Sequence, residues 1–399
     1  MRKWGTSSAV VAAFVGPGTV LTCATTGLTF GYDLGWVLLF ATGAAFVLQS
    51  LTAGTGILAQ QGLGEALAAT VRHPIARALS YTLVVLGLWV GCAAFELGNL
   101  MGAALGLQTL LGDSVSPQWF VAGLGLAAAV LLLLDVRVLL KVLAGLVALM
   151  GLLFLATALV APIDWGGAFR GAVQPTIPEG GLVNVVALIG TTIVTYNLFL
   201  HPALAKAYWR EEADRQQAWR RELFGMALFL PLGGVISWAI MLSAATLAGA
   251  NAEVPSVGAV ADLLAPVAGP AGRLLFGLGL LAAGLTSAVT APLAAAAGIR
   301  ELFGWPDDET DARYRMVWAS VVLAGVAFGL LDVSPLRAIV VAQAANGVLL
   351  PLLAGFVLYL TVRQTQQRLS PWYIGLGLLV TAVCALLGGR TLLWVASQL

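Results

Sequence analysis

The sequence predicts an all-α polytopic membrane protein, and three observations support this class. Hydrophobic residues occupy 60% of the 399 positions and charged residues only 10%, and the mean hydropathy is +0.94, whereas a soluble domain is roughly one quarter charged. Apolar windows recur along the whole chain, and Lys and Arg gather in alternate loops between them. Lipid therefore surrounds most of the chain.

A membrane-spanning helix needs about 20 mostly apolar residues, and windows of this size define eleven spans. They cover residues 6–29, 34–59, 77–107, 118–135, 139–161, 182–201, 223–249, 271–298, 313–331, 336–361 and 372–395. The loops are too short for an independent soluble domain, so residues 1–399 form a single transmembrane domain. The first apolar stretch continues through its Gly-Pro-Gly segment, as a retained span does and a cleaved signal peptide does not.

The positive charges test the number and orientation of the spans, because cytoplasmic loops collect Lys and Arg. With the N-terminus inside, 16 of the 20 Lys and Arg fall on the cytoplasmic side, and only Arg170, Arg273, Arg337 and Arg390 fall outside. Adding or removing one span would destroy this asymmetry. We therefore predict a multi-pass protein of the cell membrane with a cytoplasmic N-terminus and an extracytoplasmic C-terminus.

Composition also excludes several classes of function. A net charge of +1 provides no basic surface for nucleic acid. Cys23, Cys92 and Cys384 are scattered in apolar stretches and form neither a metal-spaced pair nor a disulfide framework. With two His and no nucleophile–base pair or metal triad, an enzyme is not expected, and neither is a cofactor. The lipid bilayer is the expected partner, and the oligomeric state stays open, with a monomer favoured.

One carboxylate stands in the middle of a span. Of the 19 Asp and Glu, only Glu96 lies at that depth, and Asn99 shares its helix face at i,i+3. Ionisable groups in hydrocarbon are expensive and commonly functional. A structural carboxyl bonded to a neighbouring helix is the alternative.

The first span contains Gly16-Pro17-Gly18-Thr19 about ten residues from its start. Proline removes a backbone donor and clashes with the preceding turn, and glycine lowers the cost of non-helical geometry. A break here would free carbonyls and expose a half-helix N-terminus, as in many transporter sites. A simple kink is the alternative, although Thr22, Thr25 and Thr26 favour a polar lining.

Polar residues recur at depth in the sixth and tenth spans. The sixth contains Gly190-Thr191-Thr192 and then Thr195-Tyr196-Asn197, and the tenth contains Gln343, Asn346 and Gly347. Buried amides must find partners, and a substrate or ion is one such partner. Spans one, three, six and ten thus point to one central site.

At these residues the chain resembles the Nramp divalent-metal transporters, a proton-coupled branch of the LeuT-type fold. Gly16-Pro17-Gly18-Thr19 and Gly31-Tyr32-Asp33-Leu34-Gly35-Trp36 stand at the spacing of the family's Asp-Pro-Gly-Asn and Gly-Tyr-x-Leu-x-Trp motifs. The similarity extends from Ala12 to about Pro351. It implies two inverted five-helix repeats (6–161 and 182–361) and an extra span at 372–395, with helices 1 and 6 interrupted at mid-membrane.

The chain departs from the family at the metal-binding positions. Gly16 replaces the family's Asp, Thr19 its Asn and Val194 its Met. A thioether selects soft transition metals, whereas Mg²⁺ sheds water reluctantly and takes oxygen ligands. The pattern is similar to the Nramp-related magnesium transporters. The proton-coupling positions are also replaced: Tyr196 stands for a His, and Glu96 and Asn99 for an acidic pair, which implies transport without protons.

The resemblance implies substrate contact at Gly16, Thr19, the carbonyl of Thr191, Val194, Asn197, Gln343 and Asn346, with Glu96 nearby. Within this set the expected metal ligands are Thr19, Thr191, Asn197, Gln343 and Glu96.

Three hypotheses follow. The first is a secondary transporter that carries partly hydrated Mg²⁺, with Mn²⁺ as a second cargo, by alternating access. The second is a carrier of a neutral or zwitterionic organic solute on the same fold. The third is a sensor or scaffold that does not transport, which gains no support because no signalling domain is attached.

Overall fold

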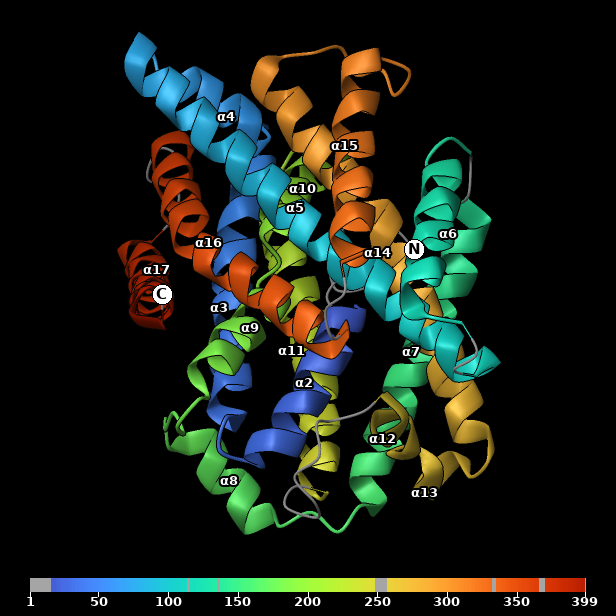
Figure 1. Ribbon diagram of the computed structural model, residues 1–399. Helices are drawn as coiled ribbons and strands as arrows, with labels where there is room; N and C mark the ends of the chain where they lie inside the picture. The colour runs from blue at the N-terminus through green and yellow to red at the C-terminus, as the bar shows by residue number, and fades with distance from the viewer. Residues whose placement is uncertain are drawn as a thin grey trace.

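The computed structural model describes residues 16–112, 115–134, 137–247, 257–331, 335–365 and 370–398, and all regular structure in them is helical (Figure 1). The helices are α2 (Pro17–Phe30), α3 (Gly35–Leu58), α4 (Leu63–Thr70), α5 (Pro74–Leu111), α6 (Pro117–Leu131), α7 (Arg137–Val160), α8 (Trp165–Val173), α9 (Leu182–Thr192), α10 (Thr195–Tyr208), α11 (Arg215–Ala245), α12 (Val257–Asp262), α13 (Ala265–Ala268), α14 (Ala271–Phe303), α15 (Ala312–Gly329), α16 (Pro335–Gln364) and α17 (Pro371–Gln398).

The predicted spans coincide with these helices. Within the described residues, eight helical segments are long and apolar enough to cross a membrane. The spans predicted at 118–135 and 313–331 form α6 and α15. The first predicted span is described from Gly16 onward, and residues 6–15 lie outside the described part. The short α8, α12 and α13 lie at one end of the molecule, and α4 lies at the other (Figure 1).

The sixth span is interrupted, and the described part of the first span also begins at a break. Ile193 (φ −98°, ψ 82°) and Val194 (φ −70°, ψ 113°) are non-helical and separate α9 from α10. Gly16 is extended (φ −87°, ψ 175°), and Pro17 occupies the first turn of α2, where a missing N–H costs nothing. The described part of the bundle therefore has three helix termini at these breaks: the N-terminus of α2, the C-terminus of α9 and the N-terminus of α10.

The two longest spans, α5 and α14, pack together through small residues that let their backbones approach. A Cβ on Gly284 would lie 2.5 Å from Cβ of Ala103 and 2.6 Å from the carbonyl oxygen of Asn99. Such small-residue contacts are how helices associate in lipid, where burial of apolar surface supplies little driving force. This packing fixes the position of α5 against α14.

We expect Gly284→Ala to lower the free energy of unfolding by about 1–3 kcal/mol, because the added methyl group overpacks the interface. Gly43→Ala on α3 is the matched control, since a Cβ there meets no atom within 4 Å. Thermal unfolding in detergent measures both. Equal midpoints for the two variants would contradict the close packing of α5 on α14.

Candidate functional site

A small cavity lined by buried side chains lies where the two breaks meet. Its lining comes from five parts of the bundle: Gly16, Gly18 and Thr19 at α2, Phe95 and Asn99 on α5, Thr191, Val194 and Tyr196 at the α9–α10 break, Ser287 on α14 and Gln343 on α16. Its volume of about 10 Å³ is room for about one water molecule. The polar side chains that line it are all at most 5% exposed.

The polar groups that line the cavity are all neutral, and Phe95 and Val194 add apolar surface. The hydroxyls of Thr19 and Thr191 are 2.9 Å apart and join α2 to α9 by a buried hydrogen bond. Oε1 of Gln343 has no hydrogen-bond partner among the described residues. Among the described residues, no carboxylate or sulfur atom lines the cavity, and no group of three His, Cys, Asp or Glu could hold a metal. A cation here would be held by hydroxyl, amide and carbonyl groups.

Five of the expected contact residues are brought together around the cavity, and they are Gly16, Thr19, Thr191, Val194 and Gln343. Two of the replaced proton-coupling positions, Asn99 and Tyr196, also line it. Ser287 was missed. A single Ser in an apolar span commonly bonds its own helix backbone, so its residue type carried no signal.

Glu96, Asn197 and Asn346 do not line the cavity. Glu96 was expected near the substrate as a metal ligand, but its Cβ and Cγ pack against α15: a Cβ on Gly325 would lie 2.5 Å from its Cγ. Phe95 and Asn99, four residues apart, share the cavity face of α5, and Glu96 is rotated about 100° from Phe95. Glu96 is fully buried, and neither carboxyl oxygen has a partner among the described residues.

The two amides also lie off the cavity. Asn197 is 2% exposed, and its Oδ1 has no partner within the described ranges. Asn346 has both ends of its amide occupied: it accepts a hydrogen bond from Thr195 Oγ1 at 2.6 Å and donates one to the carbonyl of Gly190 at 2.5 Å.

Hydrogen bonds close the bundle on both sides of the cavity. Toward the C-terminal end of α2, Asn184 Nδ2 on α9 donates to Thr26 Oγ1 at 3.1 Å. On the other side, α10 is tied to α3 and α11, because His201 lies 2.8 Å from Oε1 of Gln49 and 3.2 Å from Oε1 of Glu222. Each set ties a helix that begins or ends at a break to a neighbouring helix.

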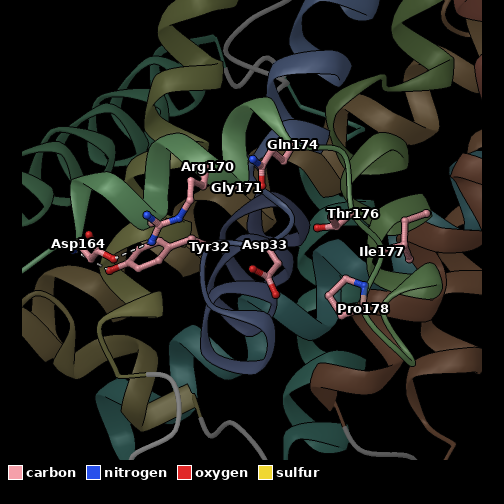
Figure 2. A pocket seen from close by; sticks show the side chains of 10 residues that line it. Tyr32, Asp33, Asp164, Arg170, Gly171, Gln174, Thr176, Ile177 and Pro178 are labelled. Atoms are coloured by element: carbon pink, nitrogen blue, oxygen red, sulfur yellow. Dashed lines mark hydrogen bonds and ion pairs between the residues drawn. The ribbon is translucent and has the colours of Figure 1, made fainter.

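A larger pocket of about 530 Å³ opens beyond the C-terminal end of α2. Figure 2 shows Tyr32, Asp33 and Arg170 around it, with Asp164 beside the ring of Tyr32. Arg170 and Asp164 form an ion pair of 3.7 Å, and Tyr32 Oη accepts a hydrogen bond from the backbone N–H of Asp164. Since α2 has 14 residues and is about 21 Å long, this pocket and the cavity lie at opposite ends of one helix.

A polytopic bundle with a buried polar cavity at two helix breaks has the architecture of a transporter. The family model described as "Natural resistance-associated macrophage protein-like" (Nramp) matches residues 8–394. The chain therefore belongs to the Nramp family, whose members are transporters rather than enzymes.

Named relatives cover much of the chain. It is 27% identical over 368 residues to "Divalent metal cation transporter MntH" of Acidiphilium cryptum, an alignment that covers 89% of this chain and 82% of the relative. It is 30% identical over 297 residues to the protein of the same name from Verminephrobacter eiseniae, covering 73% and 66%.

Solved structures show the fold. The Eremococcus coleocola manganese transporter, in complex with an aromatic bis-isothiourea compound, superposes with a TM-score of 0.78 at 20% identity over 97% of this chain and 85% of that one. Mhp1 in an inward-facing conformation gives 0.59 at 15% identity over 98% and 90%. The predicted LeuT-type fold with interrupted helices is confirmed, whereas the residue boundaries of the repeats stay a prediction.

We expect Thr26→Val to loosen the closure between α2 and α9, because it removes the hydroxyl that accepts from Asn184. A buried hydrogen bond contributes about 0.5–1.5 kcal/mol, so a cysteine placed at the fully buried Thr22 should react about two to ten times faster with an external thiol reagent.

Thr25→Val is the control, because the Thr25 hydroxyl donates to carbonyls of its own helix. Equal labelling rates in the two backgrounds would show that this hydrogen bond does not close the pathway.

Proposed function

We propose that this protein carries a divalent metal cation across the cell membrane by alternating access. The observation that carries the proposal is the cavity at the two breaks, where Thr19, Thr191 and Gln343 converge in a chain of the Nramp family. Half-helix ends with freed backbone groups are how such folds bind ions at mid-membrane. The names of the relatives, divalent metal cation transporter and manganese transporter, support the same class of cargo.

The hydrogen bonds on the two sides of the cavity act as alternating closures in this proposal. Thr26 and Asn184 separate the cavity from the pocket at Tyr32, which serves as the entrance on the extracytoplasmic side. His201, with Gln49 and Glu222, holds α10 on the cytoplasmic side. This assignment uses the orientation that the Lys and Arg distribution favours, with the N-terminus inside.

Magnesium is the proposed main cargo, with Mn²⁺ carried as well. Neutral oxygen donors suit hard cations, whereas a thioether would favour softer metals, and Val194 occupies the position where the family has Met. In this conformation the cavity holds about one water-sized particle. A partly hydrated ion therefore enters only when the Thr19 and Thr191 hydroxyls move apart.

Proton coupling is not required in this proposal. The membrane potential supplies about 2.3 kcal/mol per charge per 100 mV, and because a divalent cation carries two charges, it gains twice this energy on moving inward. Tyr196 lines the cavity where the family has a His, and a phenol stays protonated at neutral pH, with an ordinary pKa of about 10.

We expect purified protein in liposomes to take up Mg²⁺ and Mn²⁺ without acidification of the lumen, followed by enclosed metal-sensitive and pH-sensitive dyes. Thr19→Val should lower uptake about 10- to 100-fold, because a ligand to a charged group contributes about 1.5–3 kcal/mol. Thr25→Val, whose hydroxyl bonds its own helix, should match the unmodified protein.

Metal fluxes equal to those of empty liposomes, with transport of a labelled neutral or zwitterionic solute, would replace this proposal by the organic-solute alternative. Lumen acidification in step with metal uptake would overturn the uncoupled mechanism alone.

We expect the double change Gly16→Asp and Val194→Met to add affinity for Mn²⁺ and Cd²⁺ relative to Mg²⁺. It introduces a carboxylate and a soft sulfur, and a Cβ on Gly16 fits, since it meets its first atom, Oγ of Ser287, at 3.4 Å. Competition of each metal against Mg²⁺ uptake measures the change. An unaltered order of affinities in a folded variant would show that these positions do not face the bound ion.

A further inference from the structure

Breaking the sixth span removes the helical partners of backbone groups that are buried inside the bundle. In a continuous helix the carbonyl of residue i accepts from the N–H of residue i+4, so Gly190 would accept from Val194. Val194 is instead extended. An unsatisfied carbonyl in hydrocarbon costs several kcal/mol, so this one needs another donor.

Asn346 of α16 supplies that donor. Its Nδ2 donates to the Gly190 carbonyl at 2.5 Å, in place of the N–H that the break removed. Its Oδ1 accepts from the hydroxyl of Thr195 at 2.6 Å, and Thr195 is the first residue of α10. One side-chain amide therefore joins the last turn of α9 to the first turn of α10 across the break.

The surroundings of Asn346 hold the amide in this position. Gly190 and Gly347 leave no room for a Cβ, because the backbones of α16 and α9 are in contact there. On the opposite side, a Cβ on Gly91 of α5 would lie 3.2 Å from the Thr195 hydroxyl and 3.5 Å from Asn346 Oδ1. Asn346 is fully buried and Thr195 is 1% exposed.

Gln343, one turn earlier on α16, faces the cavity, and its Oε1 has no hydrogen-bond partner in the part of the chain that the structure describes. The two amides of one helix thus differ in their contacts: the Gln343 Oε1 can bind a cation in the cavity, whereas the Asn346 amide is hydrogen-bonded to Gly190 and Thr195. We infer that Asn346 is a positioning residue that sets the geometry of the break through Gly190 and Thr195, rather than a ligand of the cation. This inference rests on the proposed cation transport, where the break supplies Thr191 and Val194 to the cavity.

The test uses four variants in reconstituted protein. Asn346→Leu removes the amide, Thr195→Val removes only its hydroxyl partner, Thr195→Ser keeps that hydroxyl, and the fourth variant combines the first two. Thr192→Val is the matched control, because the buried Thr192 hydroxyl has no partner among the described residues and does not line the cavity. Mg²⁺ and Mn²⁺ uptake give a maximal rate and a half-saturating concentration for each variant.

Asn346→Leu and Thr195→Val should each lower the maximal rate about tenfold. The double variant should be no slower than the slower single variant, because the effects of substitutions at contacting residues do not add. Thr195→Ser should restore the rate. The ratio of half-saturating concentrations for Mg²⁺ and Mn²⁺ should stay unchanged, because the ligands are the same. Multiplied effects in the double variant, or a changed Mg²⁺ to Mn²⁺ ratio in Asn346→Leu alone, would overturn the inference.

Asn346→Asp separates positioning from ligation. A ligand would bind a cation more tightly as a carboxylate, whereas a positioning residue would lose its donor to Gly190 and slow transport. Tighter binding in this variant would therefore assign Asn346 to the cation instead.

Thermal unfolding of the same variants in metal-free detergent keeps the two proposals distinguishable. The unmodified protein could transport no metal while the Asn346 and Thr195 substitutions lower the thermal unfolding midpoint non-additively. The proposed transport would then fail, but the link that Asn346 makes between Gly190 and Thr195 would be supported. If the unmodified protein transports metal, but the effects of the Asn346 and Thr195 substitutions are additive in both the transport rate and the unfolding midpoint, only the inference about Asn346 fails.

Discussion

Backbone groups inside hydrocarbon must be paired within the protein, and the interrupted helices of this bundle are organised around that constraint. At the break between α9 and α10 the N–H of Ile193 still donates to the carbonyl of Ile189. Val194 is extended, however, and the regular helical pairing of the Gly190 carbonyl is lost. The break persists because α16 lies against α9 closely enough for the Asn346 amide to reach Gly190. The same close approach places Gln343 beside the cavity. One part of α16 therefore supplies both a group that faces the cavity and a group that supports the broken backbone.

The cavity is polar but uncharged, and this determines its chemistry. Thr19, Thr191 and Gln343 present oxygen atoms without formal charge, and Glu96, whose Cβ and Cγ pack against Gly325 of α15, does not line the cavity. A neutral site gives a cation no full compensating charge, so the cost of removing its water stays high. Such a site favours weak binding and release, which a carrier needs. The absence of sulfur from the lining removes the preference for soft metals that a thioether gives.

Much of the fold could be predicted from local features. The spans followed from apolar length, and the break near Pro17 followed from the backbone chemistry of proline and glycine. The break at Ile193 and Val194 was harder, because no proline lies there and the preceding residues are good span formers. The resemblance to a family supplied that expectation. The repeat boundaries and the orientation rest on sequence patterns alone.

Within the site, the sequence indicated which helices contribute but not which side chains meet. Spans one, three, six and ten do converge, and span eight adds Ser287. Three positions separate Gln343 from Asn346, and both are buried amides, yet one faces the cavity and the other faces the Gly190 carbonyl. Likewise Phe95 and Asn99 line the cavity, whereas Glu96 does not.

By itself, the sequence determined the membrane class, the positions of the spans and the interruption at Gly16-Pro17, because hydropathy and backbone freedom are properties of short segments. Only the tertiary structure decided which polar groups face the cavity and which bond to neighbouring helices. Helices that are apolar all round carry little periodicity to set their rotation. Their rotation depends on close contacts such as Gly190 with α16 and Gly325 with Glu96, which join residues far apart in the chain.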